Sequence, residues 1–279
     1  MQTNWYASIW SKFDLLSEYT ATHWPTYTSG GMGIGSKDLY GPFSNKAWFI
    51  FEHLSRAQHD GRLPSQPIVC EVGFNAGHSA MLFLDTLPNA IVHEWDLGER
   101  YGPKNAQLLT RVYPGRFHYH AGDSARTLPA FVKENPDVMC DVLFIDGAKG
   151  LVRRYHDVLL FGQIAKPGAL IFGDEANSKQ CMSGQVDEQD ALCAAGAEQT
   201  EHAWNRLVRS NVLTYEACSA PGQNQKNERD IVCAWRYASR TEAEIKSALE
   251  ASTEALRQAE IRHRGKGERF KFLRGRRYL

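Results

Sequence analysis

The chain has 279 residues, of which 43% are hydrophobic and 23% are charged, and its 32 basic and 32 acidic side chains give a formal net charge of zero. This composition is typical of a globular protein and excludes an acidic or basic disordered chain. The length suffices for one large α/β domain or two small ones. No apolar run approaches the roughly 20 residues of a membrane-spanning helix, and the N-terminus lacks a secretory pattern, so a soluble cytoplasmic protein is predicted.

Residues 1–65 are rich in aromatic side chains and predict two helices, one before Tyr19 and one over Asn45–Ser55. Between them, Ser29–Gly35 is glycine-rich but lacks the preceding strand of a phosphate-binding loop. A lid or a plain connector is favoured over a nucleotide site. We therefore expect residues 1–65 to form an N-terminal helical lid or accessory segment.

From Pro67 to Tyr237, short apolar runs alternate with helix-like stretches, which is the pattern of a parallel sheet with helices on both faces. The predicted strands are 68–72, 90–96, 116–120, 140–146 and 169–174, with helices beginning near residues 77, 101, 125 and 151. Pro167-Gly168 is expected to end the fourth of these helices and turn into the fifth strand. Residues 175–198 are polar and predict an insertion.

The runs 212–217 and 230–237 predict an antiparallel hairpin at one edge of the sheet. A helix is predicted over Thr241–Ile261. The tail 262–279 contains eight basic residues and one acid, which leaves 24 basic against 31 acidic residues in the body of the chain. Such a tail could bind nucleic acid, although a disordered or docked end is favoured.

The six cysteines show no CxxC spacing, and Cys70, Cys140 and Cys233 lie in apolar runs. Buried free thiols in a reducing compartment are the favoured interpretation of these three. Cys181 and Cys193 lie in a polar stretch, where unpaired thiols are favoured over a bridge.

The first predicted strand leads into Val69-Cys-Glu-Val-Gly-Phe-Asn-Ala-Gly-His-Ser79. Gly73 and Gly77 bracket a tight turn that lets the backbone approach a ligand, and the helix after it offers unpaired N–H groups to an anion. A dinucleotide fingerprint would read GxGxxG, whereas three residues separate Gly73 from Gly77 here. The motif predicts a ligand site at the carboxyl end of a strand, without a pyrophosphate cradle.

The ExGxxxG pattern of Glu71, Gly73 and Gly77 resembles motif I of the class I S-adenosylmethionine-dependent methyltransferases. Asp96, at the end of the second strand, is similar to the acid that binds the two ribose hydroxyls in that family. Gly122-Asp-Ser124 resembles the turn beside the adenine, and Ser124 is also a candidate helix cap. The resemblance implies a cofactor-binding set of Glu71, Gly73, Asn75, Gly77, His78, Ser79, Asp96, Leu97, Gly122, Asp123, Ser124 and Asp146.

The resemblance also implies a Rossmann-like, doubly wound α/β fold. It would have a seven-stranded, mostly parallel sheet with an antiparallel edge hairpin, helices on both faces and the N-terminal helical lid. Residues 66–240 would form the methyltransferase core, with 175–198 inserted, and residues 241–279 would form the C-terminal helix and basic tail. His78 is expected either to contact the carboxyl end of the cofactor or to lie on the surface at a helix N-terminus.

Two further strands end in acids, at Asp146 and at Asp174-Glu175. Neighbouring parallel strands bring their carboxyl ends together, so these carboxylates can converge on a hard divalent cation such as Mg²⁺. The segment is similar to the catechol-type, metal-dependent O-methyltransferases and to other small-molecule methyltransferases with an FIDG segment, which implies Lys149 as general base and Asp146 as a second catalytic residue. That family has an amide where this chain has Glu175, so a metal-free acid at Asp146 remains an open alternative.

These features predict a methyltransferase that uses S-adenosylmethionine to methylate a small molecule, on a hydroxyl chelated to the metal, with Lys149 or an acid taking the proton. A metal-independent N- or O-methyltransferase, an RNA-directed enzyme that uses the basic tail and a non-catalytic binding module are the alternatives. The chain has no NPPY-like tetrapeptide, which argues against an enzyme that methylates an exocyclic base amine, and a nucleic-acid partner is disfavoured. A homodimer is left open.

Overall fold

The computed structural model describes residues 2–24, 45–147, 151–174, 211–219 and 232–238, with isolated positions between 204 and 210 and between 244 and 254. Several predicted features lie outside these residues. They are the segment Ser29–Gly35, Lys149, Glu175 with the insertion 175–198, most of the helix Thr241–Ile261, and the basic tail 262–279. Within the described ranges, no helix has both the length and the apolar character needed to cross a membrane.

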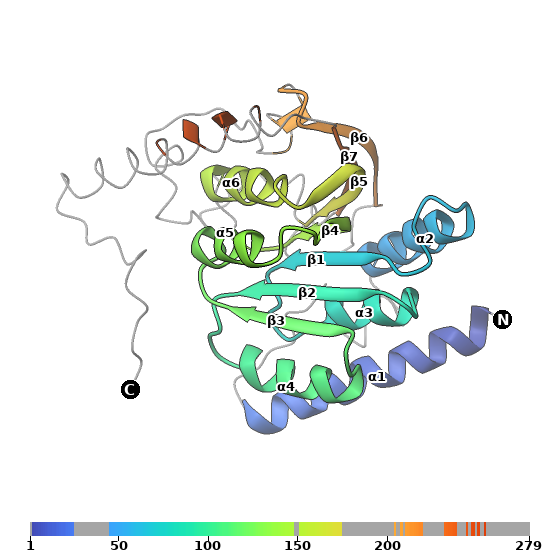
Figure 1. Cartoon of the computed structure of the whole chain (residues 1–279). Helices are drawn as coiled ribbons and strands as arrows, with labels where there is room; N and C mark the ends of the chain where they lie inside the picture. Colours follow the sequence, from blue (N-terminus) through green and yellow to red (C-terminus); the bar gives the residue numbers. More distant parts are fainter. Residues whose placement is uncertain are drawn as a thin grey trace.

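The described strands form one seven-stranded sheet in the order β3-β2-β1-β4-β5-β7-β6 (Figure 1). The strands are β1 Ile68–Val72, β2 Ile91–Asp96, β3 Phe117–Ala121, β4 Cys140–Ile145, β5 Ala165–Gly173, β6 Leu213–Cys218 and β7 Cys233–Tyr237. The first five pair in parallel, whereas β7 is antiparallel to both β5 and β6. The predicted parallel core with an antiparallel hairpin at one edge is confirmed.

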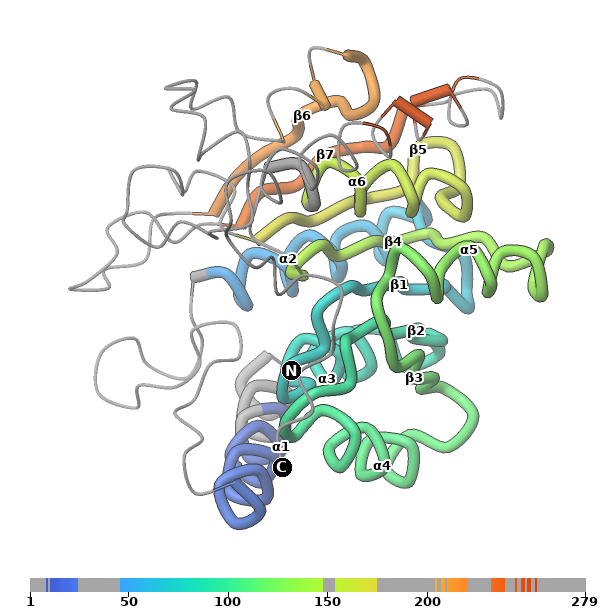
Figure 2. The backbone as a smooth tube through the Cα atoms, turned by 90° about the vertical axis from the view of Figure 1, so that its left-hand side faces the viewer, coloured from blue at the N-terminus to red at the C-terminus, as the bar shows by residue number. Residues whose placement is uncertain are grey.

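Helices cover both faces of the sheet. They are α1 Gln2–His23, α2 Asn45–His59, α3 His78–Thr86, α4 Gly102–Val112, α5 Ser124–Glu134 and α6 Leu151–Phe161. Side chains of α1, α2, α3 and α4 share one hydrophobic core with one face of the sheet, and those of α5 and α6 share a second core with the other face. Figure 2 shows α1 lying alongside α4 and next to α3.

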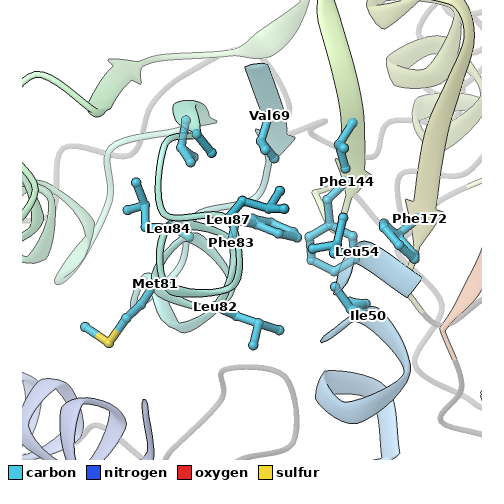
Figure 3. Close-up of a cluster of buried hydrophobic side chains, with 14 of the residues drawn as sticks. Ile50, Leu54, Val69, Met81, Leu82, Phe83, Leu84, Leu87, Phe144 and Phe172 are labelled. Carbon is cyan, nitrogen blue, oxygen red and sulfur yellow. The ribbon is translucent and has the colours of Figure 1, made fainter. Parts of the chain in front are cut away.

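The central strands read as continuous apolar runs because both of their faces are buried. All six residues of β4 are buried, whereas only Phe117 is buried in the edge strand β3. In the first core, α3 supplies Phe83, which lies between the helix and the sheet close to Phe144 (Figure 3). Ile50 and Leu54 bring α2 onto the same cluster, so the two N-terminal helices are part of the packed core.

The sequence placed the start of β5 too late. The strand begins at Ala165 and runs through Pro167-Gly168, where a helix stop and turn were expected. The ladder with β4 passes from Cys140↔Ala165 directly to Val142↔Leu170, so extra residues of β5 bulge outward at this point. A bulge accommodates proline because the missing N–H falls where the ladder is already interrupted.

The free-thiol interpretation of the apolar cysteines is wrong. Cys70 and Cys140 form a disulfide between β1 and β4, and Cys218 and Cys233 form one between β6 and β7. Cys218 and Cys233 are direct partners across the ladder. Pairings of this kind depend on strand register, which sequence spacing does not give. The argument for a reducing compartment from these cysteines therefore fails, while Cys181 and Cys193 lie outside the described residues.

Candidate active site at the carboxyl ends of the strands

The turn between β1 and α3 is built around two glycines in conformations that disfavour side chains. Gly73 has a φ of 106°, and a Cβ placed on it would lie 2.5 Å from the carbonyl carbon and oxygen of Asp146. Gly77 has a φ of 90° at the N-terminal cap of α3, and its Cβ would meet the ring of Phe74. The expected close-packed turn is present, and it brings the carboxyl ends of β1 and β4 into backbone contact.

Asp96 ends β2 and faces this turn. Its Oδ2 accepts a hydrogen bond from the Asn75 N–H at 3.2 Å, and its Oδ1 accepts one from the Gly98 N–H at 2.9 Å. The Tyr101 hydroxyl donates to the Asn75 side chain, which links the N-terminal end of α4 to the same turn. The Tyr119 hydroxyl also donates to Oδ1, at 3.4 Å, so three of the about four acceptor positions of this carboxylate are occupied. One position remains for a ligand hydroxyl, and a second is gained where a ligand hydroxyl replaces that of Tyr119. Leu97, the next residue, is 63% exposed and can contact that ligand.

Two carboxyl groups lie buried beneath the turn. Glu71 and Glu94 are register partners on β1 and β2, and both are fully buried. Burial raises the pKa of Glu71 to about 8, and it raises the pKa of Glu94 well above its ordinary value. The Ser79 hydroxyl donates to Glu71 Oε1 at 2.5 Å. Because two neighbouring carboxyl groups away from water disfavour a second negative charge, the pair favours holding a proton.

His78 is buried, so the expectation that it lies on the surface is wrong. Its side chain is covered by α1, where the Ser17 hydroxyl lies 2.9 Å from Nε2 and the Phe13 ring packs edge-on. Burial lowers the pKa of His78 to about 4, so the imidazole is neutral near neutral pH. Contact between His78 and a cofactor carboxylate stays a prediction.

The turn after β3 joins the same edge of the sheet. The Gly122 N–H donates to the Asp96 carbonyl oxygen at 2.7 Å. Asp123, and not Ser124, caps α5, because its side chain accepts from the Ala125 N–H at 3.0 Å. The Ser124 hydroxyl instead donates to Asp157 of α6 at 2.8 Å. The two adjacent residues were both suitable caps by type, and only the backbone conformation distinguishes them.

Asp146 and Asp174 end the neighbouring parallel strands β4 and β5, as predicted. The Asp174 N–H donates to the Ile145 carbonyl at 3.1 Å, which places both acids at one edge. The Asp174 side chain is not open to a metal ion, however, because Lys46 of α2 donates to its Oδ1 at 2.9 Å. Within the described ranges, no three His, Cys, Asp or Glu side chains are grouped so as to hold a metal ion. The described members of the expected Mg²⁺ site therefore do not form one, and its third member, Glu175, lies outside the described residues.

Sequence reasoning missed Glu94, Lys46 and the contribution of α1. Glu94 could have been found, because strand alternation places it on the same face as Asp96, two positions later. No local sequence pattern marked Lys46 as a site residue, because its partner Asp174 lies 128 positions away in the sequence.

Comparison with known proteins locates the matching part of the chain. Residues 70–176 match a family model described as a methyltransferase domain. No curated protein sequence matched.

Solved structures with related folds include a protein provisionally described as a caffeoyl-CoA O-methyltransferase from Staphylococcus aureus. It is 14% identical, with a TM-score of 0.48, over 67% of this chain and 83% of that one. A protein provisionally described as an O-methyltransferase from Klebsiella pneumoniae is 16% identical, with a TM-score of 0.47, over 68% and 90% of the two chains. The N-methyltransferase NodS from Bradyrhizobium japonicum is 12% identical, with a TM-score of 0.44, over 69% and 96%.

The matched residues run from β1 through the end of β5, and they contain the glycine turn, Asp96 and Asp146. The seven-stranded, mostly parallel sheet with an antiparallel hairpin at one edge is the one that the resemblance implied. Residues 70–176 of the chain therefore match a methyltransferase domain.

Proposed function

We propose that this methyltransferase transfers a methyl group from S-adenosylmethionine to an oxygen or nitrogen of a small molecule. The observation that carries the proposal is the position of Asp96, whose carboxylate is fixed by two backbone N–H groups beside the Gly73–Gly77 turn. A fixed acceptor next to a turn without Cβ atoms suits a ligand with a vicinal diol and an anionic end.

In this proposal the cofactor lies across the carboxyl ends of β1, β2 and β3. Asp96 binds the ribose hydroxyls and Leu97 packs against the base, while Gly122, Asp123 and Ser124 line the adenine side. The turn from Gly73 through Asn75 to Gly77, with His78 and Ser79 at the start of α3, receives the methionine end. Glu71 supports Ser79 from below through the 2.5 Å hydrogen bond.

S-adenosylmethionine supplies an activated methyl group, so the protein mainly has to orient the acceptor and receive its proton. The acceptor lone pair forms the new bond to the methyl carbon while the carbon–sulfur bond breaks toward sulfur. In this proposal Asp146, which lies at the end of β4 beside the glycine turn, holds the acceptor or takes its proton. Lys149 remains a candidate base on the resemblance alone, since it lies outside the described residues.

Mg²⁺ is not part of the proposal, because the carboxylate of Asp174 is already paired with Lys46. Cytoplasmic location is not part of it either, since the thiols that favoured a reducing compartment are bonded.

The test is isothermal titration of the full chain with S-adenosylmethionine, S-adenosylhomocysteine and NAD⁺. We expect both sulfur ligands to bind and NAD⁺ not to bind. Asp96→Asn should weaken binding by about 10- to 100-fold, the effect of losing one or two hydrogen bonds to a charged group. Asp137→Asn, the same change at an exposed loop residue, should leave binding unchanged. Equal losses in the two variants, or tighter binding of NAD⁺, would refute the assignment.

A further inference from the structure

The crevice between the ends of β4 and β5 is where the sequence predicted a divalent cation. Ile145 and Gly173 are register partners, so Asp146 and Asp174 follow them at neighbouring positions. Both acids lie on the sheet face that α2 and α3 cover, as the alternation from the buried Phe144 and Phe172 requires. Asp146 and Asp174 therefore occupy neighbouring positions on one face of the sheet, where a metal site would need a cation to meet their carboxylates.

Lys46 already supplies a cation there. It lies in the first turn of α2, and its Nζ donates to Asp174 Oδ1 at 2.9 Å. The Lys46 and Asp174 side chains are only 7% and 9% exposed. A buried pair of this kind is held more firmly than a surface pair, because separating it leaves an uncompensated charge away from water. The ammonium is therefore a fixed part of the crevice.

A second buried cation approaches the same residue from α6. Arg154 is 3% exposed, and its Nη1 donates to the backbone carbonyl of Asp174 at 2.8 Å. Asp174 thus has a positive side chain on its carboxylate and another on its carbonyl oxygen. A divalent ion entering the crevice would meet like charge from both, and it would have to displace Lys46 from a buried position.

We infer that Lys46 takes the place of a divalent cation in this crevice, so that methyl transfer proceeds without metal. The inference rests on the proposed function for its chemical meaning. A metal-assisted enzyme of this kind needs an acceptor with two adjacent oxygens that chelate the ion, whereas this site has no such requirement. The acceptor is therefore a small molecule that needs only one nucleophilic oxygen or nitrogen, whose proton passes to a basic group of the protein or to solvent.

The test measures binding of Mn²⁺ to the full chain by electron paramagnetic resonance, in which bound Mn²⁺ is lost from the sharp signal of the free ion. We expect the wild-type chain to leave the free Mn²⁺ signal unchanged at equimolar concentration. Lys46→Met removes the ammonium and keeps the apolar stem, and it should gain one Mn²⁺. Lys12→Met is the matched control, because it breaks the Lys12–Asp85 ion pair between α1 and α3 outside the crevice. It should gain no Mn²⁺.

Stoichiometric binding of Mn²⁺ by the wild-type chain that is lost in Asp174→Asn would overturn the inference. So would a folded Lys46→Met protein that binds no more Mn²⁺ than Lys12→Met. If Lys46→Met does not fold, the comparison of wild type with Asp174→Asn still tests the inference. Two outcomes support it: the wild-type chain binds no Mn²⁺, or it binds Mn²⁺ equally well with and without Asp174→Asn. These Mn²⁺-binding measurements do not need the cofactor. Titration of the same samples with S-adenosylmethionine therefore tests the proposed function separately.

Discussion

Replacing Gly73 with alanine tests the central turn of the site. A Cβ on Gly73 would lie 2.5 Å from two backbone atoms of Asp146 and 2.8 Å from the Gly147 nitrogen. Asp146 and Gly147 follow directly on β4, and their backbone atoms cannot rotate away as a side chain can, so the turn and the end of β4 must separate. The overpacking should destabilise the protein by about 1–3 kcal/mol. The positive φ should add about 1–2 kcal/mol, offset by about 0.4–1 kcal/mol from the stiffer unfolded chain.

The expected net loss for Gly73→Ala is thus about 1–5 kcal/mol, measured as the shift of the urea unfolding midpoint at unchanged slope. Gly61→Ala is the matched control, because Gly61 has a φ of 67° and nothing within 4 Å of its Cβ position. It should lose only about 1 kcal/mol, from the backbone term alone. If the two variants lose the same free energy of unfolding, the close contact between the turn and β4 does not exist as described.

Glu71→Gln should flatten the pH dependence of stability. The raised pKa of Glu71 means that the folded chain holds a proton between pH 4.5, the ordinary value, and about pH 8, whereas the unfolded chain has lost it. The contribution of Glu71 to the free energy of unfolding is at its maximum below this pH window. It falls as pH rises through the window, by up to about 1.4 kcal/mol per pH unit. Urea unfolding across this window should show a shallower slope for Glu71→Gln than for wild type or the exposed control Glu134→Gln, and equal slopes would contradict the argument. Asp123→Ala should cost about 0.5–2 kcal/mol in unfolding free energy by removing the cap of α5, while Asp123→Asn keeps most of it. Equal losses for these two variants would show that the cap bond is not what Asp123 contributes.

The parts of the fold that the sequence predicted are those with a local pattern. The turn from Gly73 to Gly77 was readable because an apolar strand, two glycines and a helix follow one another within a few residues. The sequence pattern predicted strand ends at Asp96, Asp146 and Asp174. Parallel topology then implied that these acids lie at one edge of the sheet.

The parts that could not be predicted depend on contacts between distant segments or on exact backbone conformation. The Cys70–Cys140 disulfide requires the pairing of β1 with β4, and the Lys46–Asp174 pair requires α2 to pack on that edge. Asp123 and the next residue, Ser124, are both suitable N-terminal caps for α5 by residue type. Residue type alone therefore could not predict which of them caps the helix.

Because α1 packs against the core, the folded unit is larger than the segment that matches the family model. The match begins at residue 70, yet Thr20 accepts a hydrogen bond from the buried amide of Asn105 at 2.7 Å, and Ser17 meets His78. A fragment cut at the family boundary would expose this amide and imidazole together with the apolar surface that Phe13 and Leu16 cover. A fragment that lacks the first helix is therefore expected to have a lower free energy of unfolding than the full chain.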